Sequence, residues 1–284
     1  MKKYNYAKIN IALNIVNKSK PQNLHDLDMV NITIQLKDEV KANFKKDGNE
    51  IIIECNHPQV PLDQQNLVYK VIEKYKRIFN LQFSCHIQIK KCIPVQSGMA
   101  GGSGNAAAML DLLDKFFKTK MTVLQKMRFL ESITSDGPYM LLSTPCRVKG
   151  KGEQVIPIES KLKGKILVIK PKSGCETKKV YEQLDYKNLI HPNLNKVEFA
   201  LKQNNYPLLA KHVDNSLLIS ACKINNEIED IINRLRTCGF EIVSLTGSGS
   251  TCFALSKEKF PYKTAKKVFK KENYELCEVY SIRK

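Results

Sequence analysis

The sequence predicts an α+β protein built from two domains. Three observations support this fold class. Apolar and polar residues alternate in several early segments, an alanine-rich helical segment follows a cluster of glycines, and helical and strand patterns alternate after residue 162. A chain of 284 residues is long enough for two modest domains, each with its own core.

The first domain is expected over residues 1–161. Period-two alternation predicts strands over 4–14, 30–36, 50–55 and 83–89. Helical spacing predicts helices over 66–79, 103–117 and 123–133, and the turn-forming residues 134–138 should end the last of them. Two short strands are expected to follow, over 146–148 and 154–158.

The second domain is expected over residues 162–284. Its proposed start rests on the lysine- and glycine-rich stretch 161–165, which is typical of a connection between domains. Strands are predicted over 166–169, 242–245, 251–255 and 276–282. Helices are predicted over 177–184, 194–203, 224–238 and 262–271.

Composition limits the class of protein. The formal net charge of +18 is compatible with nucleic acid, an anionic membrane surface or an anionic small substrate, and also with a lysine-rich solvated surface. No basic stripe with interleaved aromatic residues is present, which disfavours a nucleic-acid partner. No apolar run reaches the roughly 18 residues of a membrane span, so no membrane association is expected.

Cysteine usage points to a reducing compartment. The nine cysteines form no CxxC pair and show no regular spacing, so neither a zinc site nor a disulfide framework is predicted. The amino terminus also lacks the apolar stretch of a secretory signal. We therefore expect free thiols and a cytoplasmic location.

The strongest chemical signal is a glycine loop over residues 94–104. Glycine lets backbone N–H groups approach phosphate oxygens closely, and the amino terminus of the following helix adds a positive dipole. We expect Ser103 to cap that helix, or to offer its hydroxyl to a phosphate or magnesium ion. A plain tight connection is the alternative. The loop comprises Pro94, Val95, Gln96, Ser97, Gly98, Met99, Ala100, Gly101, Gly102, Ser103 and Gly104.

The spacing of these glycines excludes two common nucleotide sites. No Gly-Lys-Ser/Thr follows, as a Walker loop requires, and the pattern does not fit a dinucleotide fingerprint. A second small-residue segment over 245–250, here called the late turn, offers Gly247, Ser248 and Gly249 as further donors to the same ligand. An ordinary hairpin turn explains it equally well.

Three segments together resemble the motifs of the GHMP kinases. These are Ala7-Lys8-Ile9-Asn10, the middle segment 93–107 and Leu245-Thr246-Gly247-Ser248-Gly249, in the family's order and spacing. Segments 135–139, 150–153 and 176–181 resemble one branch of that family, whose substrate is a cytidyl diphosphate alcohol. The resemblance implies an amino-terminal domain like ribosomal protein S5 domain 2, a ferredoxin-like carboxy-terminal domain, ATP and Mg²⁺.

The resemblance also implies roles for single residues. Lys8 falls on the family's active-site lysine and Asp136 on its catalytic aspartate, which accepts the proton of the attacking hydroxyl. His25 and Tyr181 fall on substrate-binding positions, Tyr181 as one face of a cytosine clamp. From the residues alone, Asp136 fits a turn and Lys8 fits a surface strand. Asp26 and Asp28 are rival carboxylates.

Three positions differ from the family pattern. Leu24 replaces an aromatic residue of the clamp, Gly104 replaces a hydroxyl residue of the loop, and Gly137 replaces a β-branched residue after the aspartate. Two alternatives follow: a GHMP kinase acting on another small alcohol, or a nucleotide-binding homologue without turnover. If the chain is a kinase, for the cytidyl alcohol or for another one, we expect a small-molecule substrate and no nucleic-acid or membrane partner. We expect a monomer or a weak homodimer.

Overall fold

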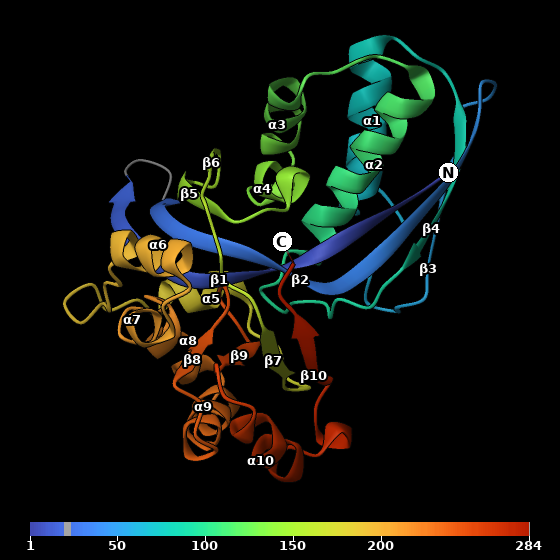
Figure 1. Cartoon of the computed structure of the whole chain (residues 1–284). Coiled ribbons are helices and arrows are strands. Elements are labelled where there is room, and N and C mark those ends of the chain that lie inside the picture. Colours follow the sequence, from blue (N-terminus) through green and yellow to red (C-terminus); the bar gives the residue numbers. More distant parts are fainter. Residues whose placement is uncertain (20–23, 284) are drawn as a thin grey trace. The chain divides into compact units, whose positions relative to one another are not determined.

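The computed structural model describes residues 1–19 and 24–283 (Figure 1). It is a mixed structure of helices and sheets, which confirms the predicted α+β class. The chain divides into two compact units. The first unit comprises Met1–Ala7, Leu36–Val95 and Ala100–Ser143, and the second comprises Lys8–Gln35, Gln96–Met99 and Thr144–Lys284. These units follow packing rather than sequence order, and the division near residue 162 stays a prediction.

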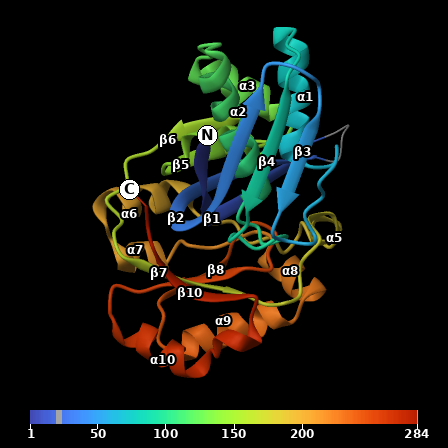
Figure 2. The same ribbon diagram turned by 90° about the vertical axis from the view of Figure 1, so that its right-hand side faces the viewer.

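The first unit packs helices against one face of a sheet (Figure 2). The carboxy-terminal half of β2 (Leu24–Lys45) runs antiparallel to β4 (Ser84–Lys90), and β4 pairs in parallel with β3 (Ile51–Cys55). The helices are α1 (Leu67–Phe79), α2 (Gly101–Phe117), α3 (Val123–Glu131) and α4 (Gly137–Leu142). Helix α1 begins where the Asn66 side chain accepts a hydrogen bond from Val68 N, a preferred cap.

The second unit contains β1 (Lys2–Ser19) from Lys8 onward and the amino-terminal half of β2. That half of β2 pairs with β5 (Cys146–Gly150), which pairs with β6 (Gln154–Pro157). A separate antiparallel sheet has the order β10-β7-β9-β8. Its strands are β7 (Lys165–Lys170), β8 (Ile242–Leu245), β9 (Cys252–Leu255) and β10 (Leu276–Ser281).

Helices pack against this antiparallel sheet. Figure 2 shows α9 and α10 together on one face of it. Both β8 and β9 are buried along their whole length, so both belong to the core of this unit. The helices of the unit are α5 (Thr177–Glu182), α6 (Leu194–Gln203), α7 (Tyr206–Ala210), α8 (Leu218–Ile224), α9 (Glu227–Thr237) and α10 (Phe260–Val268), with a 3₁₀ turn at Lys271–Asn273.

The structure corrects several predicted element boundaries. Strands β1 and β2 are much longer than their apolar cores suggested. Helix α4 begins within the expected turn cluster, at Gly137, and Pro138 is compatible with its first turn. The helix expected from residue 224 begins at Glu227, since Asn225 is extended and ends α8. Among the described residues, no helix is both long and apolar enough to cross a bilayer.

Candidate functional site

Segments from the start, middle and end of the sequence meet in the second unit. The backbone N–H of Lys8 donates to the carbonyl of Met99 in the glycine loop, at 3.2 Å. Gly98 packs against the late turn so closely that a Cβ atom would lie 2.2 Å from the Thr246 oxygen. A Cβ on Gly247 would lie 3.0 Å from the Gly98 oxygen. Both glycines have positive φ, so backbone-to-backbone contact requires glycine on each side.

Lys8 is held by a chain of buried polar side chains. Its Nζ donates to Asn10 Oδ1 at 2.7 Å, and Asn10 Nδ2 donates to Asn31 Oδ1 at 2.6 Å. The Asn10 backbone N–H donates to Thr246 Oγ1 at 3.0 Å, which links the first motif to the late turn. Lys8 is only 4% exposed, so the alternative of a surface lysine is wrong.

The late turn has supports that the sequence did not reveal. It connects the antiparallel pair β8 and β9, so it is a hairpin connection as well as a neighbour of the glycine loop. Asn215 Nδ2 donates to the carbonyls of Leu245 and Gly247, each at 2.9 Å. Thr177 Oγ1 and Ser248 Oγ share a hydrogen bond of 2.8 Å. These bonds fix a turn that small residues alone would leave mobile.

The carboxy-terminal part of the glycine loop lies in the first unit and opens α2. The helix begins at Gly101, two residues earlier than predicted, and no side chain caps it among the described residues. The prediction that Ser103 caps the helix is wrong, because Ser103 Oγ is bonded to Thr134 Oγ1 at 2.6 Å. The N–H groups of the first turn therefore remain uncapped by side chains, which suits an anion.

Gly102 is the open position of this turn. A Cβ atom there would meet nothing nearer than Leu67 Cδ1 at 3.6 Å, and the residue is exposed. At Gly101, by contrast, a Cβ would lie 2.7 Å from Lys91 Nζ. Packing therefore explains a glycine at 101 but leaves Gly102 without a packing reason.

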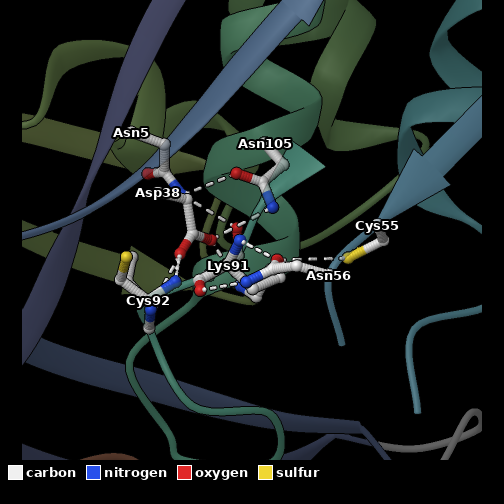
Figure 3. A network of polar contacts seen from close by, with 9 residues as sticks. Asn5, Asp38, Cys55, Asn56, Lys91, Cys92 and Asn105 are labelled. Atoms are coloured by element: carbon white, nitrogen blue, oxygen red, sulfur yellow. Dashed lines mark hydrogen bonds and ion pairs between the residues drawn. The ribbon is translucent and has the colours of Figure 1, made fainter. Parts of the chain in front are cut away.

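A buried carboxylate ties the two ends of the glycine loop together (Figure 3). Asp38 is fully buried, and its Oδ1 accepts hydrogen bonds from the backbone N–H groups of Cys92 and Ile93, each at 2.8 Å. Its Oδ2 accepts from Asn105 Nδ2 in α2 at 3.1 Å and pairs with Lys91 Nζ. One side chain thus anchors both the segment entering the loop and the helix leaving it.

Asp136 stands at the start of α4 in the first unit. It is half-buried and lies in the turn that precedes the helix, so the turn-residue alternative stays open, and its side chain does not cap α4. The next residue is fixed, since Gly137 N–H donates to the Thr134 carbonyl at 3.1 Å. A Cβ on Gly137 would lie 2.8 Å from Leu130 Cβ, so packing favours glycine there.

His25 lies within a group of aromatic rings in the second unit. Its ring centroid is 4.7 Å from that of Tyr181, and its Nε2 is 2.5 Å from the Tyr186 hydroxyl. Desolvation raises the pKa of Tyr186, and its hydroxyl can donate to the imidazole or accept from it, depending on the tautomer of His25. Tyr186 was not predicted. The structure does not describe Gln22, Asn23 or the side chain of Leu24, so the expectation for Leu24 stays a prediction.

The structure thus groups some of the predicted site residues. Lys8, His25, Tyr181, loop residues 96–99 and the late turn belong to the second unit, whereas loop residues 94–95 and 100–104 and Asp136 belong to the first. The pairing of Lys8 with Asp136 stays a prediction. Among the described residues, no cluster of three or more His, Cys, Asp or Glu side chains is arranged to hold a metal ion.

Comparisons with known proteins identify the family of this chain. Residues 66–138, which include the glycine loop and Asp136, match the GHMP kinases N terminal domain. The chain is 33% identical over 277 residues to the 4-diphosphocytidyl-2-C-methyl-D-erythritol kinase of Clostridium tetani, covering 97% of this chain and 96% of that protein. It is 34% identical over 287 residues to the enzyme of the same name from Clostridium perfringens, covering 100% and 98%.

Solved structures support the fold. A crystal structure of 4-(cytidine 5'-diphospho)-2C-methyl-D-erythritol kinase superposes with a TM-score of 0.82 at 20% identity, covering both chains fully. Homoserine kinase from Cytophaga hutchinsonii gives a TM-score of 0.75 at 17% identity, covering 100% of this chain and 94% of the other. At these identities the likeness concerns the fold.

Proposed function

Because this chain belongs to the GHMP kinase family, we propose that it phosphorylates the 2-hydroxyl of 4-diphosphocytidyl-2-C-methyl-D-erythritol, with ATP as phosphate donor. Its curated relatives carry the name of that kinase and match it along nearly the whole chain. The reaction serves isoprenoid precursor synthesis by the non-mevalonate route.

The observation that carries the proposal is the junction of Lys8, Gly98 and Gly247. Residues 90 or more positions apart are joined there by short backbone contacts that need glycine, while Lys8 is buried and oriented by Asn10. A loop that only connects two elements does not require such a junction. A phosphate-binding site does require it, because backbone N–H groups and a cation must reach the same phosphate chain.

In the proposed reaction, Asp136 accepts the proton of the substrate hydroxyl as that oxygen attacks the γ-phosphorus. The bond from the γ-phosphorus to the bridging oxygen breaks, and ADP leaves. Lys8 stabilises the charge that develops on the transferring group. Its hydrogen bond to Asn10 limits the directions in which the ammonium can point. Alignment and charge neutralisation supply most of the acceleration.

The phosphates of ATP are assigned to the glycine loop and the late turn. The uncapped amino terminus of α2 offers backbone N–H groups, and Gly102 leaves the approach open. Mg²⁺ would neutralise charge on the phosphates of ATP, and the Ser103 hydroxyl is the protein group that we propose for holding it. Magnesium usually binds through substrate phosphates and water with few protein ligands.

The cytosine base is assigned to His25 and Tyr181, with Tyr186 as an additional support. The Tyr186 hydroxyl holds the imidazole, and the Tyr181 ring lies against it. This arrangement offers both a stacking surface and a hydrogen-bonding edge. We further propose a cytoplasmic monomer or weak homodimer without a nucleic-acid partner. The nine free thiols support a reducing compartment.

The deciding experiment is coupled ATP turnover with purified protein and Mg²⁺, with the cytidyl substrate present or absent. Phosphate transfer to this substrate, and not to homoserine or mevalonate, is expected. Preference for another alcohol would identify a GHMP kinase of different specificity, and ATP binding without transfer to any alcohol would identify a non-catalytic homologue. The Asp136→Asn protein, purified identically, controls for contaminating kinases.

A further inference from the structure

A large cavity lies in the second unit, and none of its lining residues is assigned to the kinase site. Its volume is about 950 Å³, close to the upper end for small-molecule pockets. Helix α10 forms one wall and strands β7 and β10 form another. It is lined by residues 163–165, 256–259, 262–263, 265–266 and 269–272 and by Leu167, Asn204, Tyr206, Cys277, Glu278 and Val279.

The inner surface of this cavity is apolar. Leu167, Ala265 and Phe269 are each at most 5% exposed, and Val279 and Cys277 add apolar surface from β10. Cavity walls of this kind favour the apolar part of a ligand, because its transfer from water is favourable. A purely polar ligand would leave this surface unused.

The rim of the cavity is strongly basic. Eight of its 21 lining residues are lysines, compared with 40 lysines among the 284 residues of the chain. The enrichment therefore exceeds the chain's general excess of lysine. Within the described residues, only Lys271 of the eight is in an ion pair, with Glu278. The other carboxylates of the lining are Glu258 and Glu272, so positive charge dominates.

Part of this basic rim is held rigidly. Three successive carbonyl oxygens, those of residues 163–165, accept hydrogen bonds from the Tyr206 hydroxyl at 2.7 Å, the Ile282 N–H at 3.1 Å and the Tyr262 hydroxyl. These bonds fix the backbone that carries Lys163 and Lys165. A fixed basic edge beside an apolar wall reduces the ordering cost of binding an anion.

We propose that this cavity binds a small amphiphilic anion, with a phosphate-like head at the lysine rim and an apolar body against Phe269 and its neighbours. A second copy of the chain is a poor occupant, because the formal net charge of each copy is +18. Single-stranded nucleic acid is also a poor occupant. The hydroxyls of Tyr206 and Tyr262 bond to the rim backbone, and both rings belong to the cavity wall rather than to an exposed stacking surface.

The test is calorimetric titration with octyl phosphate below its aggregation concentration. Inorganic phosphate supplies the head alone, and octanol supplies the chain alone. We expect one octyl phosphate per protein molecule and binding of either fragment at least about tenfold weaker, because each lacks one of the two interactions. Equal affinity for phosphate or for octanol would overturn the proposal.

Two pairs of variants locate the binding. Lys263→Glu/Lys266→Glu reverses charge at the rim, and Lys211→Glu/Lys267→Glu makes the same charge change at exposed lysines outside the lining. Val279→Trp narrows the cavity at a position 43% exposed, and Val268→Trp adds the same ring outside it, at 38%. Only the lining variants should lower the affinity for octyl phosphate, by about tenfold.

Unchanged affinity in folded lining variants would overturn the proposal, as would equal losses in the control variants. Two competitors test other sources of the anion. Displacement of octyl phosphate by a 12-nucleotide single strand would assign the rim to nucleic acid. Binding to phosphatidylglycerol vesicles that is lost in the lining variants, without binding of monomeric octyl phosphate, would assign it to a membrane surface. ATP turnover is expected to be normal in all four variants.

Discussion

Asn5 occupies the space that a side chain at position 104 would need. A Cβ atom on Gly104 would lie 1.7 Å from Asn5 Oδ1, while Asn5 Nδ2 donates to the Gly101 carbonyl at 2.8 Å and to Asn105 Oδ1 at 3.3 Å. The glycine that replaces the family's hydroxyl residue is thus matched by an asparagine that binds the first turn of α2. The two positions form one packing unit.

This relationship predicts a rescue. Gly104→Ala should lower the free energy of unfolding by about 1–3 kcal/mol, the usual cost of overpacking. Combining it with Asn5→Gly should cost less than the sum of the two single changes, because the added methyl group then has room. Urea unfolding of the two single variants and the double variant measures the coupling. Strict additivity would contradict the packing relationship.

Gly102 allows binding to be separated from folding. Gly102→Ala should keep or raise stability, by up to about 1 kcal/mol, since a helical glycine is replaced where space is open. The same methyl group should lower the affinity for ATP, because it stands where phosphate approaches the backbone. The larger side chain of Gly102→Val should abolish ATP binding. Thermal unfolding and nucleotide titration of the same samples check this. Gly101→Ala is the matched comparison, and there stability should fall. Normal ATP affinity in Gly102→Val would make the loop a connector.

Asp136→Asn should reduce kcat by about a hundredfold or more and leave ATP affinity nearly unchanged, because it removes a base without removing a nucleotide contact. Steady-state kinetics and equilibrium ATP binding provide the two measurements. Near-normal kcat would remove Asp136 from the mechanism. A loss of ATP affinity alone would assign it to the nucleotide instead.

Asp38→Asn should destabilise the fold by about 3–5 kcal/mol, because Lys91 would remain buried without its anionic partner. ATP affinity should also fall, since the carboxylate anchors both ends of the glycine loop. The double variant Asp38→Asn/Lys91→Met should recover part of the stability but not the affinity, because only the charge imbalance is relieved. Chemical unfolding and ATP titration separate the two effects. If affinity recovers together with stability, Asp38 has no positioning role.

Tyr181→Ala should raise KM for the cytidyl substrate several-fold with little change in KM for ATP, because one stacking surface of about 1 kcal/mol is lost. Tyr186→Phe is an informative companion, since it keeps the ring but removes the hydroxyl that bonds His25. A smaller increase is expected there. If neither change alters use of the cytidyl substrate while ATP kinetics stay normal, the substrate assignment is wrong.

The sequence predicted the features that are encoded locally. The glycines of the loop and late turn were identifiable because close backbone contact requires glycine, and several glycines then stand close together in the sequence. Asp38, Asn215 and Asn31 were not, since each is an ordinary polar residue in its own segment. Their roles arise from partners 53, 30 and 21 positions away in the chain, which only the folded structure brings near.

Helix boundaries show the same limit. Serine is a preferred capping residue, but the Ser103 hydroxyl is hydrogen-bonded to Thr134 instead, and α2 begins two residues before Ser103. Helices α7 and α8 are short and were not predicted. Tyr206 and Leu209 of α7 and Ala221 of α8 are buried, so packing rather than periodicity stabilises them.

Because of the Asp38 anchor, the glycine loop loses its conformational entropy during folding and not during nucleotide binding. Backbone N–H groups at residues 92 and 93 and the side chain of Asn105 are bonded to one carboxylate within the protein itself. Ordering this segment therefore draws on the free energy of folding, at about 1–2 kcal/mol per residue, and not on the free energy of nucleotide binding. The folded protein is less stable by this amount, but the loop is already ordered when the nucleotide binds.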